Sequence, residues 1–154
     1  MMKLTAQAEA FKQQIKAALV NAVMPASESA IIILLMIAAH ESGGFRFVKQ
    51  NGGPALGFFQ MEPFTFYDCI DWLKHLGRFP RVCRKSSHHR LVFDVAYSVE
   101  LARVKLWRDS KALPEADDLP ALAQYAKRVW NSEAGKAEAQ DYLNAFKKYG
   151  LGEV

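Results

Sequence analysis

The longest apolar run of the chain covers residues 30–39, which carry no polar side chain. A membrane-spanning helix needs about 20 apolar residues, so this shorter run predicts a helix buried on every side in a protein core. Pro25 and Ser27 precede the run as helix start signals, and Gly43-Gly44 follows it as a stop signal. The pattern therefore predicts a mainly α protein with a buried central helix.

Further helices are predicted around this run, because apolar residues recur elsewhere at intervals of three and four. The first predicted helix carries Phe11, Ile15, Leu19 and Ala22-Val23, and the next opens at Pro63, carries Phe66, Cys69-Ile70, Leu73 and Leu76, and ends at Gly77. A third helix is capped by Asp94 and runs through Trp107, and a fourth follows a cap at Asp118. The last helix spans about 136–149, with Ala139, Tyr142, Phe146 and Tyr149 on one face.

Two segments are predicted to be irregular. Glycines, Asn51 and Pro54 interrupt residues 43–57, where only the string at 45–48 has strand character, so at most a small β-hairpin fits there. Residues 78–90 hold five Lys or Arg residues and no acid, which predicts a solvated basic loop. This loop serves either solubility or docking on an anionic polymer.

Length and composition describe an ordinary globular chain. With 154 residues, 51% of them apolar and 23% charged, we expect one domain over residues 1–154 with a core of its own. The net charge of +4 suits an anionic polymer, either cell-wall glycan with its carboxylates and phosphates or nucleic acid. A solvated surface with a mild basic excess explains the charge equally well.

Metal and disulfide chemistry are not indicated. Cys69 and Cys83 are too few for a disulfide framework, and their spacing to the histidines is not that of a metal site. His88-His89 are adjacent, so they do not face a common site on regular structure. We expect neither a metal nor an organic cofactor.

Glu41 is the main candidate for chemistry. It falls in the last turn of the predicted central helix, where the negative end of the helix dipole and the apolar surroundings disfavour an ionised carboxylate. A glutamate that holds its proton near neutral pH is suited to general acid catalysis. A surface glutamate in a fraying helix end is the alternative that position alone leaves open.

Short motifs follow Glu41 in a fixed order. They are Glu41-Ser42 with Phe45, Gly57-Phe58-Phe59-Gln60-Met61, Pro63-Phe64-Thr65, the stretch from Ala123-Gln124-Tyr125 through Val129-Trp130-Asn131 to Gly135, and Asp141-Tyr142-Leu143. This order resembles the motifs of lytic transglycosylases and goose-type lysozymes, and the resemblance extends over residues 30–149. The chain departs from the family at Phe58-Phe59, where Leu-Met is usual, and at Trp130, where Tyr is usual.

The resemblance implies a lysozyme-like fold and cleavage of the β-1,4 bond between N-acetylmuramic acid and N-acetylglucosamine in peptidoglycan. Glu41 would be the general acid and base, the two phenylalanines an apolar wall, and Trp130 a surface that stacks on sugar. The residues that the resemblance implies for substrate binding are Ser42, Gly57, Phe58, Phe59, Gln60, Met61, Tyr125, Trp130, Asn131 and Tyr142.

Two reactions remain open at this point. In a lytic transglycosylase the muramic 6-hydroxyl attacks and leaves 1,6-anhydro ends, whereas a hydrolytic lysozyme uses water. Inverting hydrolysis needs a second carboxylate, and Glu62 is the best candidate for it. Glu62 also precedes Pro63, where it can simply cap the next helix. We favour the capping role and the transglycosylase.

The expected partner is the peptidoglycan glycan strand, and the resemblance favours a bacteriophage source. Charges interrupt residues 1–18, so we predict no signal peptide and no membrane span. The protein would be made in the cytoplasm and act on the wall after release by a holin or as part of a virion. A catalytically inactive glycan-binding or virion structural module is the alternative. No predicted helix lines several cations along one face, so nucleic acid is not expected as a partner.

Overall fold

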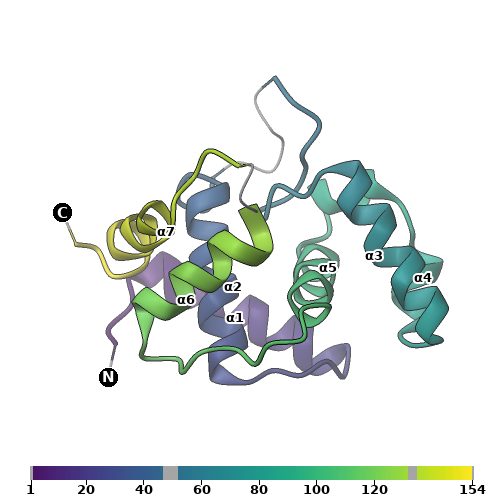
Figure 1. The fold of residues 1–154 in the computed structure, drawn as a ribbon, viewed down its shortest axis with the longest axis horizontal. Helices are drawn as coiled ribbons and strands as arrows, with labels where there is room; N and C mark the ends of the chain where they lie inside the picture. The colour runs from purple at the N-terminus through teal and green to yellow at the C-terminus, as the bar shows by residue number, and fades with distance from the viewer. Residues whose placement is uncertain (1, 47–51, 132–134, 154) are drawn as a thin grey trace.

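A computed structural model describes residues 2–46, 52–131 and 135–153, and this part of the chain is mainly α-helical, as predicted (Figure 1). Its helices are α1 (Ala6–Asn21), α2 (Glu28–Glu41), α3 (Pro63–Leu76), α4 (Pro80–Arg84), α5 (Val95–Trp107), α6 (Leu119–Ala126) and α7 (Ala139–Ala145). A 3-10 helix, η1 (His88–Val92), precedes α5, and the π-helical segments η2 (Lys127–Asn131) and η3 (Phe146–Gly150) extend α6 and α7.

β structure in the described ranges is limited to one isolated antiparallel bridge between Leu56 and Met61. Phe45, the first residue of the strand-like string, lies in a turn. Residues 47 and 48 of that string lie outside the described residues.

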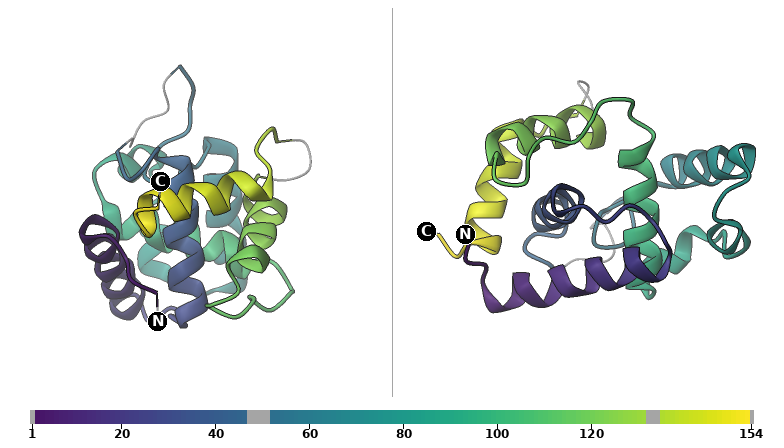
Figure 2. Two further views of the ribbon diagram at one scale, coloured as in Figure 1. Left: turned by 90° about the vertical axis from the view of Figure 1, so that its left-hand side faces the viewer. Right: turned by 90° about the horizontal axis from the view of Figure 1, so that it is seen from below.

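The central helix predicted from the apolar run is α2. Residues 30–39 are each at most 2% exposed. Figure 2 shows the reason in its right-hand view, where α1, α5, α6 and α7 form a ring around α2. The helices α3 and α4 lie on the far side of α5. Among the described residues, no helix is both long enough and apolar enough to cross a lipid bilayer.

Both ends of α2 are fixed by local hydrogen bonds. Ser27 caps the start, where its hydroxyl accepts from the Ala30 N–H at 3.1 Å. At the other end the Ser42 hydroxyl donates to the Ala38 carbonyl at 2.6 Å and accepts from the Phe45 N–H at 2.7 Å. Gly44 has a φ of +86°, and a Cβ on it would lie 2.5 Å from the Tyr149 ring. The predicted start and stop signals are therefore confirmed.

The first and last helices are shorter than predicted. The helix α1 buries Phe11, Ile15 and Leu19 but ends at Asn21, and Val23 has a φ of 57° and is 82% exposed. The chain reverses there because the Met24 N–H bonds back to the Leu19 carbonyl at 2.9 Å. The last helix begins at Ala139 instead of about 136, since a capping box at Glu138 starts it.

The prediction of a basic loop at residues 78–90 is wrong, because α4 and the first part of η1 occupy this segment. Pro80 opens α4 in its first turn. Val82 and Leu91 are buried and anchor the two short helices to the core. The Tyr97 hydroxyl of α5 also donates to the Val82 carbonyl at 3.2 Å. The cations of this segment thus sit on a folded surface.

Candidate active site

Glu41, the last residue of α2, opens into a cavity of about 550 Å³. Its side chain is 19% exposed. The cavity lies where the end of α2, the start of α3, the last turn of α5 and η2 meet. Its lining residues are Glu41, Ala55, Gln60, Met61, Glu62, Thr65, Lys105, Val129, Trp130, Asn131 and Gly135. The predicted residues Glu41, Gln60, Met61, Trp130 and Asn131 are therefore brought together.

Tyr142 of α7 holds the Glu41 carboxylate. Its hydroxyl donates to Glu41 Oε1 at 2.8 Å, and the Tyr142 side chain is fully buried. Burial, and then the charge of Glu41, raise the pKa of this phenol far above its ordinary value, so it stays a donor. Asn131 opposes this rise in the pKa of Tyr142, and Lys127 Nζ donates to Asn131 Oδ1 at 3.0 Å. The Tyr142 hydrogen bond thus positions Glu41.

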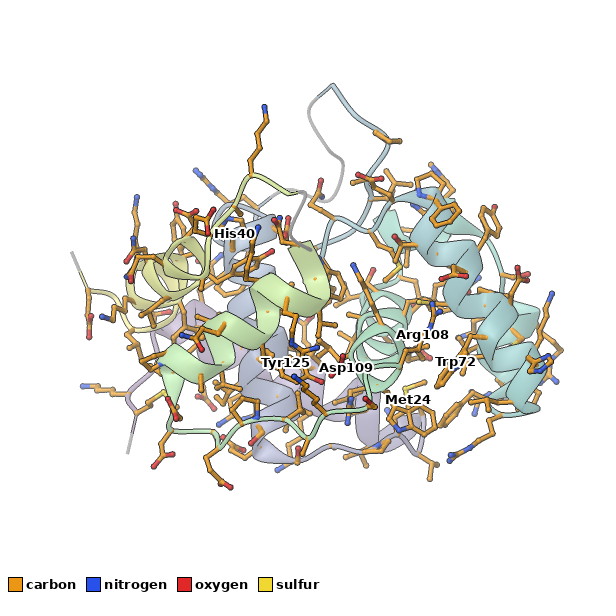
Figure 3. The ribbon with its side chains drawn as sticks, in the orientation of Figure 1. Met24, His40, Trp72, Arg108, Asp109 and Tyr125 are labelled. Atoms are coloured by element: carbon orange, nitrogen blue, oxygen red, sulfur yellow. The ribbon has the colours of Figure 1, made fainter. Side chains whose placement is uncertain are left out.

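His40 is a neighbour of the carboxylate that the sequence interpretation missed. Its Nδ1 lies 3.6 Å from Glu41 Oε1, and its ring centroid is 4.3 Å from that of Tyr142. This Nδ1 is buried and has no hydrogen-bond partner in the described part of the chain. Figure 3 labels His40 at the end of α2. Its position directly before Glu41 in the sequence could have indicated that it lies near the carboxylate.

Lys105 of α5 supplies a cation to the same cavity. Its ammonium donates to the Trp130 carbonyl at 3.0 Å and lies 4.2 Å from the Trp130 ring centroid. Burial lowers the pKa of Lys105, and the Glu41 and Glu62 carboxylates are among the charges that oppose this shift. In the sequence, Lys105 stands between Val104 and Leu106 on a helix that is apolar on both sides, and this placement could have indicated a buried functional lysine.

Glu62 lines the cavity together with Glu41 and Lys105. It occupies the N-cap position of α3, but its side chain makes no capping hydrogen bond. Glu62 thus holds the expected N-cap position, but it caps α3 without a side-chain hydrogen bond and is exposed. Two carboxyl groups therefore share one cavity.

A tight turn at residues 57–60 delivers Gln60 and Met61 to the cavity. Gly57 has a φ of +83°, and a Cβ on it would lie 3.0 Å from Ser98 Oγ and 3.1 Å from the Leu91 carbonyl. The Gln60 amide donates to the Gly57 carbonyl at 2.7 Å. Gln60 itself has a φ of 50°, which a non-glycine residue adopts only when its surroundings impose it.

Phe58 and Phe59 do not form the apolar cavity wall that was expected of them. Phe59 is 1% exposed, and its ring centroid lies 6.1 Å from that of Trp130. Phe58 packs edge-on against Phe11 at 5.1 Å between ring centroids. The turn points both rings toward the core instead of into the cavity. Trp130 covers this core, and its indole N–H donates to the Phe59 carbonyl at 3.2 Å.

Ser42 and Tyr125 are also placed away from the cavity. Ser42 is fully buried, and its hydroxyl is used in the turn that follows α2. The Tyr125 hydroxyl donates to the Lys111 carbonyl at 3.2 Å, and Figure 3 shows Tyr125 beside Asp109. Ser42 thus acts on the backbone next to Glu41, and Tyr125 fixes the loop before α6.

A second hollow, of about 390 Å³, continues the cavity, because Thr65, Lys105 and Val129 line both. Two ion pairs lie along it: Arg108 with Asp68 at 2.7 Å, and Arg128 with Asp109 at 2.7 Å. The Arg128 hydrogen bond lowers the pKa of Asp109 to about 2. The cavity and the hollow together form an extended polar groove, the shape that a polymer requires.

The described residues contain no group of three or more His, Cys, Asp or Glu side chains that could hold a metal ion. Cys69 and Cys83 are both free thiols, and burial raises the pKa of Cys69. Comparisons of this chain with models of protein families, with curated proteins and with solved structures found no match.

Proposed function

We propose that this protein is a lysozyme-like lytic transglycosylase that cleaves the β-1,4 bond between N-acetylmuramic acid and N-acetylglucosamine in peptidoglycan. The observation that carries the proposal is the Glu41 carboxyl at the end of a buried helix, held by Tyr142 at 2.8 Å and open to a groove. The order of the sequence motifs supports the same assignment.

In the proposed mechanism Glu41 protonates the glycosidic oxygen as the bond breaks, and the muramic 6-hydroxyl then attacks the sugar carbon. Glu41 takes the proton of that hydroxyl, which restores the acid and leaves a 1,6-anhydro end. Tyr142 occupies Oε1, so Oε2 is the oxygen available for proton transfer. Gln60 and Asn131, which line the cavity, would contact the sugar hydroxyl and amide groups.

Mass spectrometry of muropeptides released from purified sacculi tests the proposal. We expect 1,6-anhydro ends. Reducing ends would establish a hydrolase instead. Sacculi left intact by folded protein would contradict any muralytic activity and favour the inactive binding module.

Hydrolysis is the second candidate, because Glu62 faces the same cavity without a capping bond. Glu62→Gln separates the two reactions. For a transglycosylase we expect the variant to keep the parent rate and to release anhydro ends, since no water needs activation. A large loss of rate in a folded variant whose parent makes reducing ends would overturn our assignment and establish Glu62 as the base.

Tyr142→Phe should slow cleavage about tenfold or more, because a hydrogen bond to a charged group contributes about 1.5 to 3 kcal/mol. The rate on solubilised glycan strands is the measurement. Tyr97→Phe is the matched control, since it removes another fully buried phenol hydroxyl, one that donates to the Val82 carbonyl away from the groove. Equal losses in the two variants would contradict a specific role for Tyr142.

A further inference from the structure

A separate cavity of about 440 Å³ lies between the end of α1, the α4 segment and α5, apart from the groove of Glu41. It shares no lining residue with the cavity of Glu41. Its walls are mostly apolar, and they are formed by Ala18, Ala22, Val23, Phe79, Pro80, Val82 and Ala96. A volume of this size suits a small organic molecule, since ligand pockets span about 300 to 1,000 Å³.

Glu100 of α5 is the buried polar group of this cavity. The residue is only 7% exposed, yet its side chain lines the cavity. It makes no hydrogen bond or ion pair with any residue in the ranges 2–46, 52–131 and 135–153. Burial raises the pKa of Glu100, and Lys85 and Arg81 are among the charges that oppose this shift. The Glu100 oxygens are not among the buried atoms that lack a partner, so they reach the open space of the cavity, where a ligand can pair with them.

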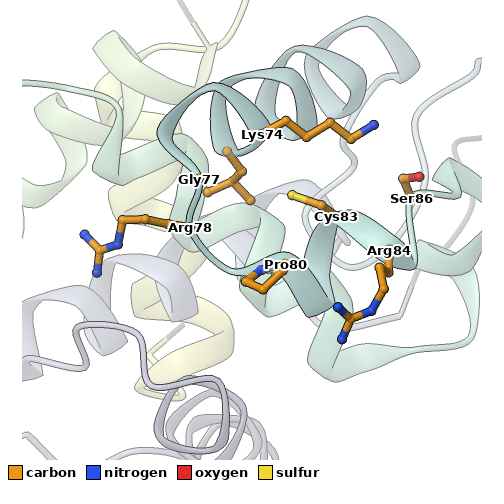
Figure 4. A pocket seen from close by; sticks show the side chains of 8 residues that line it. Lys74, Gly77, Arg78, Pro80, Cys83, Arg84 and Ser86 are labelled. Atoms are coloured by element: carbon orange, nitrogen blue, oxygen red, sulfur yellow. The ribbon is translucent and has the colours of Figure 1, made fainter.

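Three cationic side chains line the same cavity as this carboxyl. Arg78, Arg81 and Lys85 line the same cavity, and Arg78 and Arg81 are exposed. The Arg78 guanidinium lies 4.7 Å from the Trp107 ring centroid and 5.1 Å from that of Phe79. Figure 4, a view of the neighbouring hollow, shows Arg78 extending away from Lys74 and Arg84. The cavity is thus lined by one acid that is nearly buried and by cations that are more exposed.

The backbone around the cavity is also constrained. Val23 and Phe79 line it with φ values of 57° and 51°. A β-branched residue in this region is a genuine outlier, and such positions cluster at ligand sites. The local strain therefore agrees with a site shaped for binding.

We propose that this cavity binds a zwitterionic amino-acid group, with its ammonium on Glu100, its carboxylate on Arg81 and Lys85, and its carbon chain against the apolar walls. A simple cation would be repelled by the positive charges of Arg78, Arg81 and Lys85, and a simple anion would leave Glu100 without a partner. An incoming ammonium favours the ionised form of a carboxyl that burial disfavours. A free amino acid and the free end of a diamino acid in a wall peptide both carry this group.

Titration of the ¹⁵N-labelled full chain with norleucine, followed by NMR, tests the proposal. We expect saturable shifts of amides in the end of α1, in α4 and in α5, with a Kd near or below about 1 mM. Hexanoate lacks the ammonium and pentylamine lacks the carboxylate, so each should bind at least about tenfold more weakly. An N-acylated 2,6-diaminoheptanedioic acid that binds more tightly than norleucine would identify the wall peptide as the source.

Variants complete the test. Glu100→Gln should weaken norleucine binding at least about tenfold and abolish its advantage over hexanoate. Glu115→Gln, at an exposed position, and Glu41→Gln should leave the Kd unchanged. The proposal is overturned if norleucine causes no saturable shift, or if the three probes bind the parent equally. The probe comparison on the parent protein does not depend on how the variants fold, and neither result bears on glycan cleavage.

Discussion

The Glu41→Gln variant is expected to keep its fold and lose about 10² to 10⁴ in the rate of glycan cleavage. The amide preserves the shape of the side chain, and its oxygen can still accept from Tyr142, but it cannot supply or return a proton. General acid catalysis contributes a factor of this size. Release of muropeptides from sacculi gives the rate, and pull-down with sacculi should show that binding is retained.

Glu28→Gln is the matched control, because Glu28 is the first residue of the same helix of which Glu41 is the last. Glu28 is exposed and pairs with Lys12 at 2.9 Å, and such surface pairs contribute about 0 to 1 kcal/mol. This variant should cleave at the parent rate. A Glu41→Gln variant that clears sacculi as fast as the parent would show that another group is the acid.

The Leu34→Ala variant is expected to lower the free energy of unfolding by about 2 to 5 kcal/mol. Leu34 lies in the middle of α2 and is fully buried. The ring of helices around α2 leaves little room for the surroundings to collapse into the space that a smaller side chain vacates. Urea unfolding should show a lower midpoint with an unchanged slope, which is the signature of lost stability alone.

Leu76→Ala is the control for this loss, since Leu76 is 45% exposed at the end of α3. Its free energy of unfolding should stay within about 0.5 kcal/mol of the parent value. A Leu34 variant that loses less than about 1 kcal/mol would mean that the α2 surroundings repack freely. The rigid placement of Glu41 by this helix would then be in doubt.

The Glu41→Gln and Leu34→Ala variants both change the central helix α2 that positions the candidate acid. The apolar length of α2 fixes its axis inside the ring, and Ser42 and Gly44 fix the point at which it stops. Glu41 is consequently held where helix and cavity meet. Tyr142 then restrains the carboxylate itself, which is the arrangement that precise proton transfer requires.

The sequence by itself determined α2, its caps and the place of Glu41. Ten apolar residues in a row leave a helix no face for solvent, so burial on all sides follows from the sequence alone. Helix caps and glycine stops are equally local, because their hydrogen bonds join residues a few positions apart. For this reason Ser27, Asp94, Asp118 and Gly77 were predicted correctly.

Only the tertiary structure decided which side chains meet Glu41. Periodicity assigns a residue to a helix face but does not name what that face contacts, so Tyr125 and Tyr142 look alike in sequence. The partner of Glu41 is 101 positions away, and Lys105 reaches the cavity only because α5 passes η2. The turn at Gly57 directs Phe58 and Phe59 toward the core, and Glu100 faces a separate cavity because α1 and α4 leave space beside it. These contacts depend on how distant segments pack, which no local pattern of residues encodes.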